Sequence, residues 1–314
     1  MRILLTGGSG YLCREIVREI YPYCSRIVIY SRDEGKHQAM ASEFPEYPDN
    51  KMRYVLGDIQ DTGRLAQAMH GCDSVIHAAA YKMIDKCDQR NIEASINTNI
   101  IGTMSVAKAC AAAGIERAIF VSSDKACLPI SAYGAEKFMG ERIFVSWNNF
   151  STCKYAAVRY GNVHSSSKSV FQIWESLAKE GKPINVTHPE MTRYFWTGRE
   201  AALFCIARLE DMERGCVYVP KMKGLSLHVE AKKFLVPINF TGLRTIEKIH
   251  EDLINECETP QTYDRGDYWC IYPFDHEWCG EIKKRGTLVD RYFRARSCNG
   301  LTTDYVLKDE GCEP

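Results

Sequence analysis

Strands and helices alternate along the first half of this chain, and that order limits the folds it can adopt. Apolar runs of strand length occur at 2–6, 26–30, 52–56, 74–77, 117–121 and 155–159, and stretches with helical spacing at 15–20, 92–113 and 133–148. Strands that alternate with helices form right-handed βαβ units, so the sheet is parallel and helices cover both faces. The sequence therefore predicts a doubly wound α/β sheet of the Rossmann type.

A glycine-rich turn follows the first predicted strand. Gly7 and Gly10 let the backbone approach a pyrophosphate closely, and the next helix directs the positive end of its dipole at the phosphates. Cys13 replaces the third glycine of the usual dinucleotide fingerprint, so the helix must accommodate a small thiol there. The turn predicts a dinucleotide site formed by Gly7, Ser9, Gly10, Tyr11 and Leu12.

The end of the second strand indicates which dinucleotide is bound. Enzymes specific for NAD place an acid here to bind the ribose 2′-hydroxyl, and that acid would repel a 2′-phosphate. This chain instead has Ser31 and Arg32, whose hydroxyl and guanidinium suit a phosphate. We therefore expect NADP as the cofactor. The alternative is an arginine that only stacks on the adenine.

Two more strand ends are expected to contact the same cofactor. Asp58 and Ile59 come after the third strand, where they could hold the edge of the adenine. The small side chains of Ala78, Ala79 and Ala80 follow the fourth strand and leave room for a ribose and a pyrophosphate. Parallel strands end at the same edge of a sheet, so all these segments should meet there.

Two asparagines interrupt the apolar helix predicted at 92–113. Asn97 and Asn99 are polar groups that need partners in such a helix. For one of them we favour a hydrogen bond to the backbone near the central strands over a catalytic role. We assign Asn99 to the surroundings of the cofactor.

Four side chains with acid–base chemistry follow the buried strand predicted at 117–121. Asp124 and Lys125 come soon after it, while Tyr133 and Lys137 share one face of the next helix. A lysine ammonium beside a phenol favours the phenolate, so Tyr133 could act as an acid or a base near neutral pH. Asp124 and Lys125 add a second acid and a second base. The alternative is a solvated turn pair.

Composition argues against several other classes of protein. The chain has 40 basic and 40 acidic residues, so nothing indicates general affinity for nucleic acid or membranes. No apolar run approaches the roughly 18 residues that span a bilayer, and glycines stand where a signal peptide would be apolar. The 14 cysteines lack the paired spacing of zinc ligands. We expect reduced thiols, no metal and a cytoplasmic location.

The regular alternation ends near residue 160, which predicts three parts. Residues 1–160 are expected to form the NADP-binding domain. Prolines and polar turns follow, so we expect residues 161–256 to form a smaller substrate-binding lobe that returns elements to the main sheet. Residues 257–314 are rich in charged and aromatic residues with little periodicity. We expect this extension to wrap the protein surface or a neighbouring subunit.

Several motifs together resemble a known family. The turn at 6–10 is similar to that of extended short-chain dehydrogenase/reductases, and the whole pattern resembles the soluble UDP-N-acetylglucosamine 4,6-dehydratases, especially those that invert C5. The resemblance covers about residues 1–310. It rests on segments 31–34 (Ser-Arg-Asp-Glu), 124–126 (Asp-Lys-Ala), 133–137 (Tyr-Gly-Ala-Glu-Lys), 158–163 (Val-Arg-Tyr-Gly-Asn-Val), 187–193 (Thr-His-Pro-Glu-Met-Thr-Arg) and 247–251 (Glu-Lys-Ile-His-Glu).

The resemblance implies a reaction that these residues can perform. Tyr133, supported by Lys137, would take the 4-hydroxyl proton of the sugar while the C4 hydride goes to NADP. The ketone acidifies the C5 hydrogen, which neutral Lys125 would remove, while protonated Asp124 would protonate the departing 6-hydroxyl. Hydride returns to C6, so the cofactor is recycled. Protonation of C5 from the opposite face would invert that centre; retention is the alternative.

The resemblance also implies contacts with the UDP-sugar. They would come from Lys82, Ser123, Asn162, Arg193, Arg244 and Glu247. Asn162 and Arg244 match positions that hold a nucleotide diphosphate, and Glu247 would order the loop of Arg244. Arg193 could serve either the diphosphate or a buried ion pair. Lys82 could reach the sugar or stay solvated.

Three other functions remain open. On the same scaffold, a UDP-sugar 4-epimerase has no use for Asp124 and Lys125, whereas a 5,6-dehydratase would not return hydride to C6. A non-catalytic NADP-binding protein would not need Tyr133 and Lys137. The resemblance further implies a homo-oligomer, a dimer or higher. Aromatic residues of the C-terminal extension could pack between subunits or on their own domain.

Overall fold

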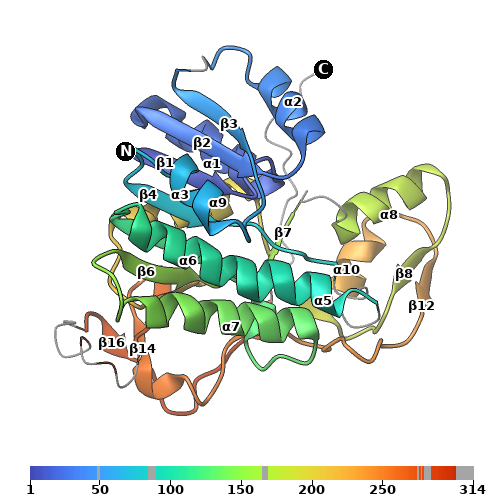
Figure 1. Cartoon of the computed structure of the whole chain (residues 1–314). Coiled ribbons are helices and arrows are strands. Elements are labelled where there is room, and N and C mark those ends of the chain that lie inside the picture. Colours follow the sequence, from blue (N-terminus) through green and yellow to red (C-terminus); the bar gives the residue numbers. More distant parts are fainter. Residues whose placement is uncertain are drawn as a thin grey trace.

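A twisted sheet runs through the centre of the molecule, with helices on both of its faces (Figure 1). The computed structural model describes residues 1–47, 50–83, 90–164, 169–273, 276, 278 and 284–301. The predicted doubly wound sheet is confirmed. Its strand order is β16-β14-β15-β10-β6-β5-β4-β1-β2-β3.

The parallel part of the sheet contains every strand predicted in the first half of the chain. Its members are β1 (Arg2–Thr6), β2 (Arg26–Ser31), β3 (Met52–Leu56), β4 (Ser74–His77), β5 (Arg117–Val121), β6 (Lys154–Val158) and β10 (Val217–Pro220). Leu4 of β1 lies opposite Val28 on one side and Val75 on the other, and all three are buried. Burial on both faces explains why these strands read as continuous apolar runs.

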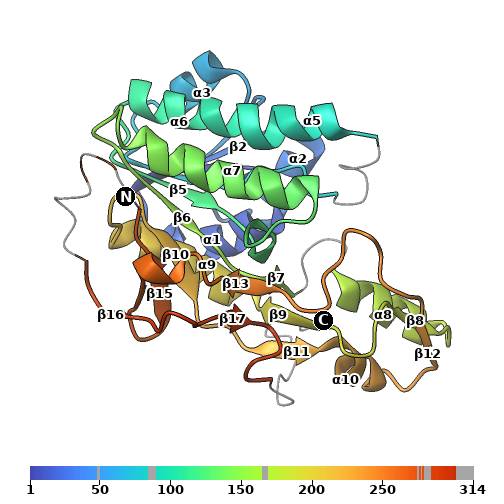
Figure 2. The same cartoon turned by 90° about the horizontal axis from the view of Figure 1, so that it is seen from below.

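Helices pack on the sheet in two layers (Figure 2). The elements of the first half are α1 (Tyr11–Ile20), the 3₁₀ turn η1 (Tyr21–Tyr23), α2 (Glu34–Glu43), α3 (Thr62–Ala68), α5 (Ile92–Ile96), the π-helical turn η2 (Asn97–Ile101), α6 (Gly102–Ala112), the 3₁₀ turn η3 (Asp124–Ala126) and α7 (Ala132–Trp147). In Figure 2, α3, α5, α6 and α7 lie on one side of the sheet, and α1 lies on the other with α9 (Gly198–Glu210).

The helix predicted at 92–113 forms and is continuous from 92 to 112, but its middle turn is π-helical. The π turn is η2, which lies between α5 and α6. Asn99 in this turn is buried, and its side chain hydrogen-bonds the backbone of Tyr81. A π turn inserts an extra residue into an α-helix and often marks a functional region. Here it sits beside the segment that follows β4.

A smaller lobe extends from one end of the sheet (Figure 1). It contains β7 (Asn162–Val163), α8 (Val170–Lys179), β8 (Ile184–Val186), β9 (Thr192–Trp196), β11 (Gly224–Ser226), α10 (Leu227–Lys232) and β12 (Ile238–Phe240). A separate apolar cluster around Phe171, Trp174 and Phe195 forms its core. The strand β10 and the helix α9 come from the same part of the chain and return to the main sheet, as predicted.

The expectation for the C-terminal extension was wrong in one respect for its described residues, 257–273, 276, 278 and 284–301; the rest of residues 257–314 lie outside the described part of the chain. We expected this extension to wrap the surface or a neighbouring subunit, but β14 (Thr262–Asp264), β15 (Tyr268–Ile271) and β16 (Thr287–Leu288) add an antiparallel edge to the main sheet. Its other elements are η4 (Thr259–Gln261) and β17 (Ala295–Arg296), which pairs with β13 (Asp252–Ile254). Pairing with β10 buries Tyr268 and Cys270, which explains the apolar residues of this segment.

A buried arginine ties the extension to the main sheet. Arg159 follows β6, is fully buried and donates to Glu141 of α7 and to Glu258. It also donates to the carbonyl oxygen of Leu253 at 2.9 Å. Burial alone would raise the pKa of Glu258, but Arg159 outweighs it and holds that pKa below its usual value. These contacts hold Leu253 and Glu258 against the carboxyl end of β6.

The described residues also bear on two other expectations. None of the helices in the described ranges is both long and apolar enough to cross a bilayer. The cysteines described are free thiols, and most of them are buried. Burial raises the pKa of several, for example that of Cys13 to about 12, so these thiols stay protonated at neutral pH.

Candidate functional site

In the described part of the chain, two cavities meet at the carboxyl ends of the parallel strands. The larger has a volume of about 670 Å³ and the smaller about 350 Å³. Lys82, Lys125 and Asn162 line both, so the two cavities adjoin at these side chains. The chain proceeds from β1 to β2 in one direction and crosses to β4 on the other side. Ligands of doubly wound folds bind at such a switch point.

The glycine turn after β1 leaves no room for side chains. Gly7 has φ +63°, and a Cβ on it would lie 2.8 Å from the Cα of Ala79. A Cβ on Gly8 would lie 2.6 Å from the carbonyl oxygen of Leu5. Gly10 directly precedes α1, whose N-terminus therefore faces the larger cavity. Exposed backbone N–H groups at a helix N-terminus suit a pyrophosphate.

The end of β2 carries the hydroxyl and the cations expected for a phosphate. The Oγ atom of Ser31 lies 3.0 Å from Oγ of Ser9 and 2.7 Å from Nε2 of His37. The side chain of Arg32 is 58% exposed, and its Nη1 lies 3.3 Å from Asp58. Lys36 lines the same cavity and was missed by the sequence analysis. The sequence feature that could have identified Lys36 is its position four residues after Arg32, in the first turn of α2.

Most residues assigned to the cofactor line the larger cavity. They are Gly7, Ser9, Gly10, Tyr11, Leu12, Ser31, Arg32, Ile59, Ala78, Ala79, Ala80, Tyr133 and Lys137. Asp58 and Asn99 are not among the lining residues. Asp58 instead accepts a hydrogen bond from the backbone N–H of Gln60, besides its contact with Arg32. The side chain of Asn99 hydrogen-bonds the backbone N–H and carbonyl oxygen of Tyr81, which is the structural role that we favoured.

Tyr133 and Lys137 lie in the first two turns of α7 and face the larger cavity. Ser131 caps this helix by accepting a hydrogen bond from the N–H of Gly134. Lys137 is buried; its Nζ donates to the carbonyl oxygen of Val121 at 2.7 Å and lies 6.0 Å from the centroid of the Tyr133 ring. Burial, with a smaller effect of Lys82, lowers the pKa of Lys137 to about 8. Its cation at neutral pH favours a phenolate nearby.

Asp124 and Lys125 lie in the turn η3; Lys125 lines both cavities, whereas Asp124 lies behind it and lines neither. Asp124 is fully buried, and its Oδ1 accepts from Ser123 at 2.8 Å and from Nζ of Lys125 at 3.0 Å. Its Oδ2 is also buried and has no hydrogen-bond partner among the residues described. Such an oxygen is costly to bury unless a ligand or a proton satisfies it.

Lys125 is charged in the resting site. Burial alone would lower its pKa, but Asp124 and Glu251 outweigh burial, so the pKa of Lys125 is raised above its ordinary value. The mechanism inferred from the sequence requires a neutral Lys125. That form is therefore reached only after Lys125 has passed on a proton, and the nearest acceptor is the oxygen of Asp124 at 3.0 Å.

The residues assigned to the substrate divide into two groups. Lys82, Asn162, Arg193, Arg244 and Glu247 line the smaller cavity, and Ser123 lines the larger one. The side chain of Arg244 is 55% exposed and pairs with Glu247 at 2.5 Å. Burial of Glu247 is outweighed by Arg244, which holds the pKa of that carboxyl below its usual value. An exposed arginine on an ordered loop can reach an anionic ligand.

Of the two roles that the sequence left open for Arg193, the structure favours buried contacts within the protein over binding of a diphosphate. Its guanidinium donates to the carbonyl oxygens of Thr192, Ile249 and Lys248 at 2.7 to 3.0 Å. Its Nε lies 3.9 Å from Glu251. These contacts hold the loop before β13 against β9, and they use most of the donors that a diphosphate would need.

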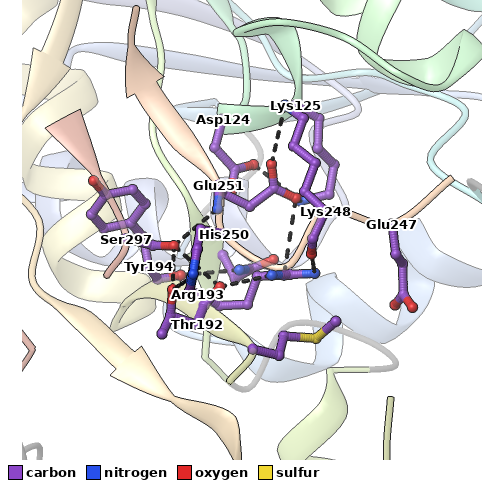
Figure 3. A network of polar contacts seen from close by, with 12 residues as sticks. Asp124, Lys125, Thr192, Arg193, Tyr194, Glu247, Lys248, His250, Glu251 and Ser297 are labelled. Atoms are coloured by element: carbon purple, nitrogen blue, oxygen red, sulfur yellow. Dashed lines mark hydrogen bonds and ion pairs between the residues drawn. The ribbon is translucent and has the colours of Figure 1, made fainter. Parts of the chain in front are cut away.

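Two charged residues at this cavity were missed by the sequence analysis (Figure 3). Nζ of Lys248 donates to the carbonyl oxygen of Cys127 at 2.7 Å and lies 3.5 Å from Glu251. Oε1 of Glu251 lies 3.8 Å from Nζ of Lys125. In the sequence, Lys248 and Glu251 served only to support the resemblance, whereas Glu247 of the same segment was assigned to the substrate site. Its loop has no periodicity that would reveal which side chains are buried.

Comparisons with known proteins agree with this arrangement. A family model described as polysaccharide biosynthesis protein matches residues 3–273. The chain is 35% identical over 280 residues to a UDP-N-acetylglucosamine 4,6-dehydratase (inverting) of Campylobacter jejuni strain 81-176, covering 86% of this chain and 82% of that protein. It is 31% identical over 287 residues to a UDP-glucose 4-epimerase of Rickettsia bellii, covering 87% and 83%.

Solved structures share the fold. The structure of Pen from Bacillus thuringiensis matches with a TM-score of 0.86 and 28% identity, covering 96% of this chain and 95% of that chain. DesIV, a dTDP-glucose 4,6-dehydratase of Streptomyces venezuelae, matches with a TM-score of 0.73 and 18% identity, over 79% and 87%. The family model and the Campylobacter relative each span most of the chain. The chain therefore belongs to the polysaccharide biosynthesis protein family, within the extended short-chain dehydrogenase/reductases.

Proposed function

We propose that this protein is a UDP-N-acetylglucosamine 4,6-dehydratase that inverts C5 and uses NADP. One observation carries the proposal: Lys125 lines both cavities, Asp124 is buried directly behind it and hydrogen-bonded to it, and Tyr133 lines the larger cavity. An oxidation alone would need only Tyr133 and Lys137. A second acid–base pair is what an elimination requires. The name of the Campylobacter relative supports the same reaction.

The larger cavity fits a nicotinamide dinucleotide. The turn at Gly7 and Gly10 would hold the pyrophosphate, and Ser31, Arg32 and Lys36 would hold a 2′-phosphate. When bound, the nicotinamide supplies an acceptor for the C4 hydride and returns that hydride to C6. Asp33, the acid nearest the end of β2, also lines this cavity; it caps α2 by accepting from the N–H of Lys36, and its Oδ2 lies 3.2 Å from Nζ of the same lysine. Lys36 therefore compensates the negative charge of Asp33 beside Arg32.

The first proton transfer would belong to Tyr133. Its phenolate takes the proton of the 4-hydroxyl as the hydride leaves C4, and the charge of Lys137 stabilises that phenolate beforehand. Both side chains are buried, which excludes water from the reacting atoms and strengthens the effect of the charge. The resulting C4 ketone makes the C5 hydrogen acidic.

One internal proton transfer would prepare the elimination. If the proton of the Lys125 ammonium moves along the 3.0 Å hydrogen bond to Asp124, the site holds a neutral amine and a carboxylic acid. Lys125 then takes the C5 proton, and the C5–H electron pair forms the C5–C6 double bond. The C6–O bond breaks, and Asp124 gives its proton to the leaving hydroxyl, so water departs. After hydride return, C5 takes a proton from solvent on the other face, and Tyr133 releases to solvent the proton that it took from the 4-hydroxyl, which completes an inverting dehydration.

The smaller cavity would hold the nucleotide. Arg244 and Lys82 would offer cations to a diphosphate, and Asn162, which lines both cavities, would lie between nucleotide and sugar. The lobe of residues 161–256 would then be the substrate-binding part, and residues 1–160 the cofactor-binding part. The resemblance implies a homo-oligomer, and we expect the same of this protein.

An NMR experiment tests the reaction directly. Purified protein is incubated with UDP-N-acetylglucosamine in D₂O, without added cofactor. A new C6 methyl signal together with deuterium at C5 is expected. An unchanged sugar would reject the proposal, and a C4 epimer without a methyl group would favour the second candidate, a 4-epimerase like the Rickettsia relative.

The choice of NADP has its own test. In Arg32→Ala, the Kd for NADP should rise about 10- to 100-fold, because a charge-assisted hydrogen bond to phosphate contributes roughly 1.5–3 kcal/mol. The Kd for NAD should change little, since NAD has no 2′-phosphate. Both are measured by calorimetry on protein freed of bound nucleotide. Equal losses for the two cofactors would mean that Arg32 only stacks on adenine.

A further inference from the structure

We propose that Glu251 is a positioning residue for the elimination: its carboxylate stabilises the positive charge that forms on Lys125 as the C5 proton arrives. This inference rests on the proposed function. It starts from a cluster that the mechanism above does not use. Glu251 has a side chain only 5% exposed, yet it lines the smaller cavity (Figure 3).

The carboxylate of Glu251 lies among three cations. Oε1 is 3.8 Å from Nζ of Lys125 and 3.9 Å from Nε of Arg193, and Oε2 is 3.5 Å from Nζ of Lys248. Among the described residues, Oε2 has no hydrogen-bond partner. The charge of this carboxylate is therefore directed at the surrounding cations, and it is not absorbed by backbone N–H groups.

The backbone around Glu251 is held by the lobe and the C-terminal extension. Its N–H donates to Oγ of Ser297 at 2.9 Å, and its carbonyl oxygen accepts from the N–H of Ser297 at 2.8 Å. Oγ of Ser297 also lies 2.7 Å from Oγ1 of Thr192, which in turn lies 2.8 Å from Nδ1 of His250 (Figure 3). The position of Glu251 is thus set before any ligand binds. A charge fixed in advance stabilises a transition state without reorganisation.

The need for a second carboxylate follows from the proton count of the elimination. When Lys125 is neutral, Asp124 carries the proton, so Asp124 has no charge to offer. As the C5 proton moves to Nζ, positive charge develops on Lys125 while Asp124 is still giving up its proton. Glu251 is then the anion nearest Nζ in the cluster. Because neutral Lys125 gains nothing from this charge, Glu251 would stabilise the transition state more than the state before it.

The groups that face Lys125 determine what Glu251→Gln should do. Asp124 of η3 and Glu251 favour the ammonium, whereas Arg193 of β9 disfavours it; Lys82 and Lys248 line the same cavity. Removing the charge of Glu251 leaves Arg193 and Lys248 less neutralised. Lys125 should therefore become a weaker base, and more of it should be neutral at a given pH.

A labelling experiment without sugar tests this link. Lysines react with formaldehyde and cyanoborohydride only as neutral amines, so the methylation rate at Lys125, read by peptide mass spectrometry at pH 8.5, reports its neutral fraction. The rate should rise several-fold in Glu251→Gln. Lys82 in the same cavity serves as the internal reference, and its rate should stay constant. A rise at both lysines would indicate a loosened site, and no rise at Lys125 would contradict the charge coupling; either result overturns the inference.

The rate of dehydration should fall in Glu251→Gln, whereas the methylation rate of Lys125 rises. In Glu251→Gln, kcat for dehydration should fall on the order of 10- to 100-fold with little change in KM, because in the complex with the 4-keto sugar, where Lys125 has already become neutral, the lost interaction re-forms only as the C5 proton arrives. Glu251→Asp, which keeps the charge but shortens the side chain, should recover part of this loss. The control is Glu256→Gln, an exposed carboxylate paired with Arg294, which should behave like the parent protein.

The two tests separate two kinds of failure. A Glu251→Gln protein with unchanged kcat, or with an increase in KM alone, would overturn the inference while leaving the dehydratase intact. A parent protein that does not dehydrate the sugar would reject the proposed function. The labelling result would still report whether Glu251 controls the charge of Lys125.

Discussion

Lys125→Met should lose dehydration activity by about 10³-fold in kcat, the range expected for a group that transfers a proton in the rate-determining chemistry. Methionine keeps an unbranched apolar side chain of similar length but cannot accept the C5 proton. It also removes the donor 3.0 Å from Asp124, so that carboxylate loses the proton source that prepares it as an acid. The C6 methyl signal and the deuterium at C5 should disappear together in the D₂O experiment.

Two further variants define what this result means. Lys125→Arg keeps a positive charge between Asp124 and Glu251 but cannot become neutral, so it should be as inactive as Lys125→Met. Lys221→Met removes a lysine paired with Asp264 near the edge of the main sheet, away from both cavities, and should retain full activity. Normal dehydration by Lys125→Met would show that the base lies elsewhere.

The parallel part of the fold could be predicted because its strands are buried on both faces. β1, β4, β5 and β6 consist almost entirely of buried residues, so their apolar runs stand out between helical stretches. The turn after β1 was also readable, because glycine is needed where backbone approaches backbone as closely as at Gly7. Local sequence determines both features.

The C-terminal strands could not be predicted, because they are short and nothing in their local sequence shows that they are buried. β14 has three residues and β15 has four, which is too short for a period to appear. The burial of β15 depends on pairing with β10, which precedes it by about fifty residues in the chain, and β14 in turn pairs with β15. Long-range contacts of this kind leave little trace in local spacing.

The site shows a similar division. Asp124, Lys125, Tyr133 and Lys137 follow one strand end, so their meeting could be inferred from spacing. Glu251 reaches Lys125 only because Ser297 and Arg193 hold its loop, and those partners lie 46 and 56–58 residues away in the chain. The charge of Lys125 was beyond the sequence as well, since it depends on how closely two carboxylates approach its Nζ.

Tyr133→Phe should also lose about 10³-fold in kcat for the overall reaction, but at an earlier step than Lys125→Met. Phenylalanine preserves the ring, which is 9% exposed, and removes only the oxygen that takes the 4-hydroxyl proton. Without that oxygen no ketone forms at C4, so the C5 hydrogen of the substrate is never acidified. Both variants should therefore leave UDP-N-acetylglucosamine unchanged, and the substrate alone does not distinguish them.

The 4-keto-6-deoxy sugar that keeps the C5 configuration of the substrate separates the two variants, because its C5 hydrogen is already acidic and lies on the face from which Lys125 takes the proton. Offered this sugar in D₂O, Tyr133→Phe should still exchange C5 hydrogen for deuterium at a rate near that of the parent protein, since Lys125 is intact. Lys125→Met should exchange no faster than the sugar does in buffer without protein. Exchange by Lys125→Met but not by Tyr133→Phe would reverse the two assignments. Equal loss in both would mean that the phenol and the amine act as one unit, with the oxidation and the elimination sharing a single proton path through Tyr133.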